Sequence, residues 1–135
     1  MLLAALFLSL GMQASAQSPP LAAACTAPLK PAIEVNLYFG RDIESGGEVS
    51  DAQWAEFMAA EVTPRFPDGL SVVNVAGQSR NSRNQTLRER TKLLIVVVFD
   101  APTHQPKVAA IVDAYNKRFS QISVFRTEKP TCAGA

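Results

Sequence analysis

Residues 93–99 read LLIVVVF, an uninterrupted apolar run in a chain of 135 residues. A short run that is rich in β-branched side chains is typical of a strand buried on both faces, which places it at the centre of a sheet. Residues 33–39 read IEVNLYF, with alternate side chains facing a core, as in a strand with one buried face. The two runs predict neighbouring strands at the middle of one sheet.

A first helix is expected after residue 50. Ser50 and Gln53 have the S-x-x-Q spacing of a capping box, in which the hydroxyl and the amide satisfy free backbone donors. Apolar side chains then recur at helical spacing, and Pro64 ends the pattern. These side chains are Trp54, Phe57, Met58 and Val62.

A second helix is expected over residues 103–119, with Thr103 as its N-cap and Pro106 in the first turn. His104 is the single histidine, and its place in this first turn predicts a surface residue. The apolar stripe of this helix contains Val108, Ile111, Val112, Tyr115 and Phe119.

Two further strands complete the order. Residues 70–78 are rich in valine, and residues 121–127 form a last short strand. Residues 79–91 are polar and arginine-rich, which predicts a long hairpin connection. Strand, helix, strand, strand, helix, strand is the order of the ferredoxin-like split βαβ arrangement. We therefore predict an α+β fold with a four-stranded antiparallel sheet, strand order 4-1-3-2, and both helices on one face.

The N-terminal residues resemble an export signal. Residues 1–12 are apolar and uncharged, and residues 14–16 read ASA, which matches an A-x-A cleavage site. The run is shorter than the roughly 20 residues of a membrane span. The expected organisation is a signal peptide over 1–16, a Pro/Ala-rich linker over 17–31, the folded domain over 32–129 and a tail over 130–135. The mature chain is expected to be periplasmic or extracellular, with no membrane span.

Cys25 and Cys132 flank the folded region, and export favours a disulfide between them. In the predicted topology the first and last strands are antiparallel neighbours, so the two cysteines leave the sheet at the same end. Lipid modification of Cys25 is the alternative.

Composition excludes several classes of protein. With 13 Lys+Arg against 12 Asp+Glu, the net charge of +1 does not favour nucleic-acid binding. One histidine and no closely spaced cysteine pair predict no metal site. Phosphate-binding, dinucleotide and nucleophile-elbow motifs are absent, so no cofactor is expected.

Glu34, Asn36 and Tyr38 face away from the expected core, beside an apolar strand. A bare apolar sheet face normally has a partner, and a homodimer or a small-molecule ligand would cover it. Folding of the 79–91 loop or of the linker across the sheet is the alternative. The leading hypothesis is therefore a binding domain that acts through this face.

Two other functions remain open. The first is a small dimeric α+β-barrel enzyme with Tyr38, Arg41, Gln78 and Arg80 as its polar groups and Tyr38 as a proton donor. The second is an envelope structural module that binds another envelope protein. The basic run of residues 80–92 predicts either an anion site or a solvated loop.

Several runs also resemble a known family. They are LYFGR at 37–41, GGEVS at 46–50, VTPRFPDGL at 62–70 and RF at 118–119, together with Trp54, Phe57, Gly77, Gln78, Tyr115 and Cys132. They resemble a family of small exported bacterial proteins catalogued as a domain of unknown function, and the resemblance implies no activity. Ser79 stands where the family pattern implies an aromatic residue, so a ligand site that used this aromatic would be altered.

Overall fold

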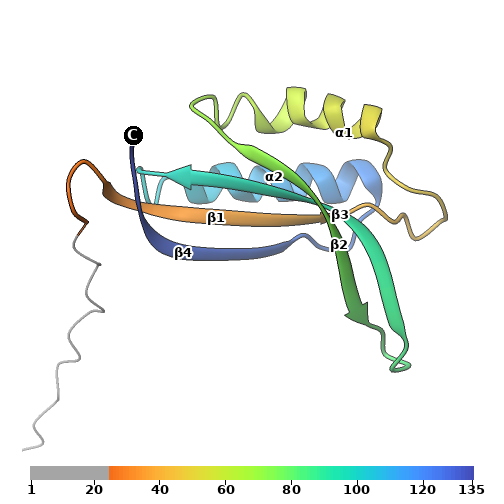
Figure 1. Ribbon diagram of the computed structural model, residues 1–135. Helices are drawn as coiled ribbons and strands as arrows, with labels where there is room; N and C mark the ends of the chain where they lie inside the picture. Colours follow the sequence, from red (N-terminus) through yellow and green to blue (C-terminus); the bar gives the residue numbers. More distant parts are fainter. Residues whose placement is uncertain (1–24) are drawn as a thin grey trace, which may run out of the picture.

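The computed structural model describes residues 25–135, which form one sheet and two helical segments (Figure 1). The sheet order is β2-β3-β1-β4, and all neighbouring strands are antiparallel. This confirms the predicted ferredoxin-like fold. The elements are β1 (Lys30–Gly40), α1 (Asp51–Phe57), a π-helical turn η1 (Met58–Val62), β2 (Ser71–Arg80), β3 (Thr86–Val98), α2 (His104–Phe119) and β4 (Phe125–Ala133).

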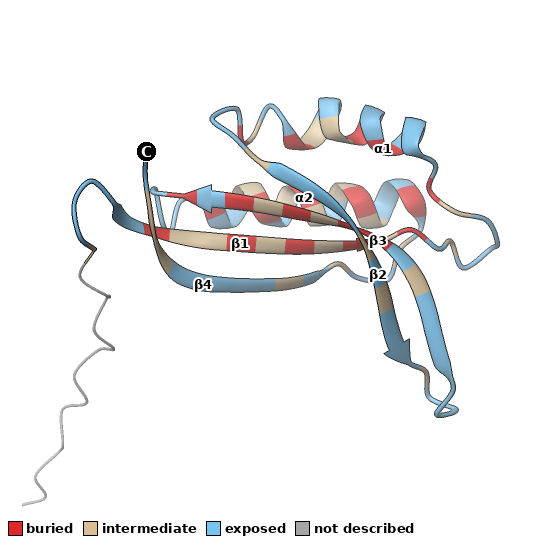
Figure 2. Cartoon of the chain, in the orientation of Figure 1, coloured by how far each residue is buried: buried red, intermediate tan, exposed pale blue. Residues whose placement is uncertain are grey.

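The core lies between the sheet and its helices, which both cover the same face (Figures 1 and 2). Alternate residues of β1 and β3 point into it, as the period of two requires. An aromatic cluster around Phe39 fills its centre, with ring centroids 4.7 Å from Tyr115 and 5.2 Å from Trp54. The buried strand residues are Val35, Leu37, Phe39, Leu94, Val96 and Val98.

The start of α1 confirms the predicted capping box. Ser50 Oγ accepts from the Gln53 backbone N–H at 3.1 Å, and Gln53 Oε1 accepts from the Ser50 N–H at 2.8 Å. The helix then widens into η1, where the Thr63 N–H donates to Met58 O at 2.9 Å. The apolar stripe therefore continues through a π-helical turn and ends before Pro64.

The predicted N-cap of α2 is wrong in its detail. Thr103 has α-helical backbone angles and makes no side-chain cap. Its hydroxyl and its N–H both donate to Asp100 O, because a turn from Asp100 already holds this residue. His104, expected at the surface, is only 2% exposed, and its Nε2 lies 3.2 Å from Glu128 Oε1 on β4.

The predicted long connection over residues 79–91 is also wrong. β2 and β3 pair as far as Arg80 and Thr86, so residues 81–85 alone form the turn. The hairpin extends beyond the helices, away from the rest of the sheet (Figure 2). Because neither of its faces is covered there, its strands carry no alternating apolar pattern. The alternative in which this loop folds across the sheet is therefore not what the structure has.

The strands extend past the expected ends of the domain. β1 begins at Lys30, inside the expected linker, and β4 runs over Phe125–Ala133 instead of residues 121–127. Pro31 pairs with Cys132 and Ile33 with Pro130, so most of the expected tail belongs to the sheet. The expected signal peptide, and the linker up to residue 24, lie outside the described residues.

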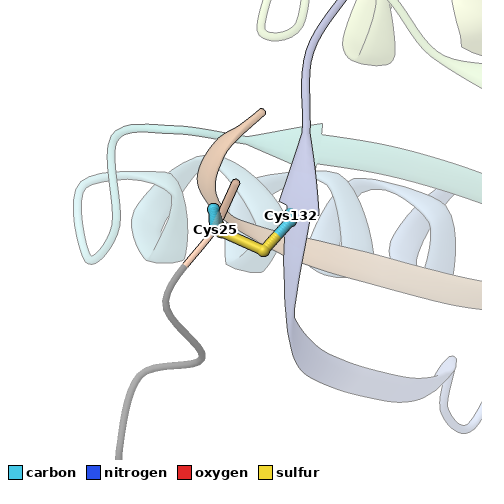
Figure 3. Close-up of a disulfide and its surroundings, with 2 residues drawn as sticks. All are labelled: Cys25 and Cys132. Atoms are coloured by element: carbon cyan, nitrogen blue, oxygen red, sulfur yellow. A yellow bond between two sulfur atoms is a disulfide. The ribbon is translucent and has the colours of Figure 1, made fainter. Parts of the chain in front are cut away.

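The predicted disulfide is present. Cys25 and Cys132 are bonded with their Cα atoms 5.6 Å apart, at the end of the sheet where β1 begins and β4 ends (Figure 3). Lipidation of Cys25 would need the same sulfur atom. Within residues 25–135, neither helix has the length and hydrophobicity that a membrane crossing requires.

Candidate functional site: the open face of the sheet

One face of the sheet has no helix over it, and its side chains follow from the strand register. Tyr38 of β1 lies between Leu93 of β3 and Phe125 of β4, and Leu93 lies beside Val73 of β2. The same parity places Asn36 beside Ile95 and Glu34 beside Val97. We call this surface the open face; its central residues are Glu34, Asn36, Tyr38, Val73, Leu93, Ile95, Val97 and Phe125.

The open face exposes large apolar side chains. Val97 is 39% exposed, Val73 is 44% exposed and Phe125 is 68% exposed. The Phe125 ring packs at a tilt against Tyr38, with the centroids 5.6 Å apart. Grouped apolar exposure of this kind is typical of a surface that contacts another molecule.

Two polar side chains of β1 on this face are hydrogen-bonded to each other. Asn36 Nδ2 donates to Glu34 Oε1 at 2.9 Å, and Lys129 Nζ lies 3.1 Å from the same oxygen. The hydrogen bonds from Asn36 and Lys129 lower the pKa of the Glu34 carboxyl below its usual range. Glu34 is therefore an ionised group at the β4 side of the face, and its Oε1 atom is the one that Asn36 and Lys129 contact.

A hollow of about 460 Å³ lies at the end of the face where β1 ends. Tyr38 and Phe125 form one side of it, and Glu89 and Thr91 of β3 form another. The Glu89 carboxylate lies over Gly40 and accepts from the Asp42 N–H at 3.2 Å. Three acids line the hollow, Asp42, Glu44 and Glu89, and no lysine or arginine does.

A larger hollow of about 860 Å³ lies between residues 64–71 and the end of β3. Its two cationic groups are paired within the chain: Arg65 pairs with Glu61 at 2.8 Å, and Lys107 pairs with Asp100 at 3.1 Å. Lys107 also lies 5.8 Å from the ring centroid of Phe66. Residues 64–70 of the TPRFPDGL run form one wall of this hollow, and the arginine of the run is paired within the chain.

Arg41 faces the helical side of the sheet and is 7% exposed. Its Nε donates to Val49 O at 2.8 Å, and its guanidinium pairs with Glu48 at 2.8 Å and Asp51 at 3.3 Å. Lys92 joins the network through Asp51 at 2.8 Å. The network fastens the loop after β1 to the sheet, so Arg41 does not reach the open face.

Gln78 and Arg80 are exposed on the hairpin. They have the opposite parity to Val73, so they do not lie on the open face. Arg80 donates to Asn84 Oδ1 at 2.9 Å across the turn. Of the six predicted site residues, the structure brings together Glu34, Asn36 and Tyr38 and separates Arg41, Gln78 and Arg80 from them.

Three of the basic side chains considered for an anion site are engaged within the chain. Lys92 pairs with Asp51, Arg90 pairs with Glu48, and Arg80 bonds to Asn84. Glu89 and Phe125 are the functional-site residues that the sequence analysis missed. Glu89 lies in a stretch whose sequence predicts a loop. For Phe125, the period of two over residues 124–127 is the sequence signal that places it on one face of a strand.

No three His, Cys, Asp or Glu side chains within residues 25–135 come together in a way that could hold a metal ion. A polar cluster around the buried His104 joins α2 to β4, where the more exposed Gln105 and Arg126 both bond to Glu128. Burial acts to raise the pKa of Glu128, but hydrogen bonds from Arg126 and Gln105 outweigh it, so the pKa lies below its usual range. This cluster stabilises the edge strand.

The fold is similar to that of two solved structures. A phage SAM lyase in complex with S-methyl-5'-thioadenosine matches with a TM-score of 0.59 and 15% identity, covering 77% of this chain and 90% of that one. A phage SAM lyase in the apo state matches with a TM-score of 0.56 and 13% identity, covering 78% and 90%. At such identities the likeness concerns the fold alone.

Comparison with sequences gives the family. No curated protein matches the chain significantly. The model of a protein family of unknown function, DUF3574, matches residues 34–134, which include all of α1, β2, β3, α2 and β4 and most of β1. The chain therefore belongs to the DUF3574 family of proteins of unknown function.

Proposed function

We propose that this protein is an exported binding domain that acts through its open face, where it holds a small organic ligand or a partner protein. The observation that carries the proposal is the exposure of Val73, Val97 and Phe125 on the sheet face that no helix covers. Burying apolar surface yields about 25 cal/mol per Å², so a partner that covers this face gains a large favourable term.

Export is supported by the disulfide, since such bonds persist in oxidising compartments. The apolar run of residues 1–12 and the ASA of residues 14–16 support the same proposal from the sequence. Cell fractionation with detection of the mature N-terminus tests it. A protein found only in the cytoplasm with residues 1–16 retained would contradict it.

The binding proposal is testable with a photoreactive amino acid placed on β2. Val73 and Val72 are neighbours with similar exposure, 44% and 38%, but they lie on opposite faces of the sheet. Irradiation of the protein in its own compartment should give adducts, resolved by mass spectrometry, from position 73 and few from position 72. A lack of adducts at position 73 would overturn the proposal.

The adduct also discriminates between occupants. A small-molecule adduct identifies a ligand-binding domain, and an adduct with an envelope protein identifies the structural module considered above.

A second candidate function is an enzyme that uses the hollow at the end of the open face. Tyr38 and Glu89 line this hollow together, and the similar fold of a phage SAM lyase has been seen with S-methyl-5'-thioadenosine. The Tyr38 hydroxyl is a candidate proton donor and Glu89 a candidate base. Thermal-shift titration with S-methyl-5'-thioadenosine should show stabilisation that Glu89→Gln reduces. No shift with either protein would remove the support for this candidate.

A further inference from the structure

Charge is separated along the open face. At one end, the Glu89 carboxylate lies over Gly40, beside Asp42 and Glu44 in the same hollow. Near the other end, Lys129 Nζ lies 3.1 Å from the Glu34 carboxylate and its side chain is still 63% exposed. Lys30 begins β1 at that end. The face therefore has an acidic end with three carboxylates and a basic end where Lys30 and Lys129 outnumber the single carboxylate of Glu34, with the apolar centre between them.

Glu89 of β3 and Lys129 of β4 both reach across to β1. Glu89 reaches over Gly40 and Lys129 reaches to Glu34, which are six residues apart on β1. At ~3.3 Å per residue this separation is about 20 Å. Its midpoint is at Leu37, so the two charges are placed symmetrically about the apolar centre formed by Tyr38, Leu93 and Ile95.

We infer that a second copy of this chain covers the open face, with its strands reversed, so that the acidic end of each copy lies over the basic end of the other. The inference rests on the proposed function, since it names the occupant of the same face.

Two identical faces can be stacked about a twofold axis in two simple ways. The charge pattern favours one of them. An axis that runs along the strands places like ends together, Glu89 over Glu89. An axis that runs across the strands near Leu37 exchanges the two ends and places Glu89 over the Glu34–Lys129 ion pair twice, with Lys30 beyond it. Like charges brought together disfavour an interface, and opposite charges fix its register.

The size of the face suits this occupant. With strands ~4.8 Å apart and ~3.3 Å per residue, four strands of eight residues present a face of about 19 by 26 Å. A second sheet of the same width covers the whole of this face, and side chains that stand out of the face add to the area buried, towards the roughly 800 Å² per partner of a standard interface. Two such sheets pack face to face about 10 Å apart, with strand directions differing by about 30°.

Sedimentation velocity of the protein with its disulfide intact should show a reversible dimer whose dissociation constant rises with salt concentration. Val73→Asp should weaken the dimer by about tenfold or more, because a charge enters the apolar contact. Val72→Asp is the matched control and should leave the dimer unchanged. A monomer at all concentrations, or a dimer that responds to position 72 and not to 73, overturns the inference.

A mixing experiment tests the reversed stacking. Lys129→Glu alone sets glutamates over Glu89, and Glu89→Lys alone sets lysines over Lys129, so each variant should be mainly monomeric. Mixed in equal amounts, they should form a heterodimer, because every end then meets its opposite. Lys117→Glu on the exposed surface of α2 is the control and should dimerise normally. If Glu89→Lys does not fold, Asp42→Lys takes its place.

Failure of the mixture to associate, with both variants folded by circular dichroism, overturns the inference. The photoreactive residue at position 73 then separates the two proposals. Adducts with other molecules leave the proposed function standing without the dimer, whereas an absence of adducts removes both.

Discussion

Gly40 ends β1 at a point where no other residue leaves room for Glu89. A Cβ atom at position 40 would overlap the Glu89 carboxylate, which accepts a hydrogen bond from the Asp42 N–H. Because the carboxylate is the end of a flexible side chain, it can move, and this bond is lost. We expect Gly40→Ala to lower the free energy of unfolding by about 1 kcal/mol.

Urea unfolding of a double-mutant cycle checks this explanation. In a Glu89→Ala background, Gly40→Ala should have little further effect, since the overlapping group is gone. An equal loss of stability in both backgrounds would show that Glu89 is not the cause.

The two tyrosines should respond differently to removal of their hydroxyls. Tyr115 is fully buried, its hydroxyl donates to Gly40 O at 2.8 Å, and burial raises the pKa of its phenol. Tyr115→Phe leaves that carbonyl unsatisfied and should lower the free energy of unfolding by about 1–2 kcal/mol. Tyr38 makes no hydrogen bond through its hydroxyl within residues 25–135, so Tyr38→Phe is the matched control. Equal effects of the two changes in urea unfolding would contradict this prediction.

At the scale of elements, the loop after β1 depends on charge. A hydrogen bond from Lys92, and then the charges of Arg41 and Lys92, hold the pKa of the Asp51 carboxyl below its usual range. A lowered pKa in the folded state means that the ionised form stabilises the fold above the usual aspartate range. This contribution is lost as the pH falls through the folded-state pKa.

We therefore expect Asp51→Asn to lower the free energy of unfolding at neutral pH. The difference in this free energy between the variant and the natural chain should shrink on acidification. Urea unfolding over a series of pH values measures it. Asp113→Asn, at an exposed position of α2, is the control and should show no such convergence. A difference that stays constant with pH would contradict the role of the Asp51 charge.

At the scale of the whole molecule, one bond ties the two ends of the sheet together. Cys25 and Cys132 are 107 residues apart in sequence, so the bond closes a loop that contains nearly all of the fold. In the chain-entropy model, a loop of this length contributes about 5 kcal/mol by restricting the unfolded chain.

Replacing both cysteines by serine should lower the free energy of unfolding by about that amount while β1 and β4 still pair. Reductant should destabilise the natural chain and have no effect on the double variant. Unfolding curves that are the same for both proteins without reductant would contradict a stabilising role for the bond.

The order of the elements and the pairing of the cysteines could be predicted because both depend on local patterns. Alternating apolar residues identify β1, the continuous apolar run identifies β3, and S-x-x-Q identifies the start of α1. Once these are ordered, the topology brings the two cysteines to one end of the sheet. On the open face, Glu34, Asn36 and Tyr38 followed from the same alternation.

The tertiary structure alone decided the rest, since it depends on contacts between distant residues that leave no local pattern. The hairpin was interpreted as a loop because its strands bury neither face and so carry no periodicity. The direction of Arg41 depends on Glu48, Asp51 and the packing of Lys92, and the burial of His104 depends on Glu128 of β4. Periodicity in a sequence reports which face of an element is buried, but the partner that buries a polar side chain is known only when the chain has folded.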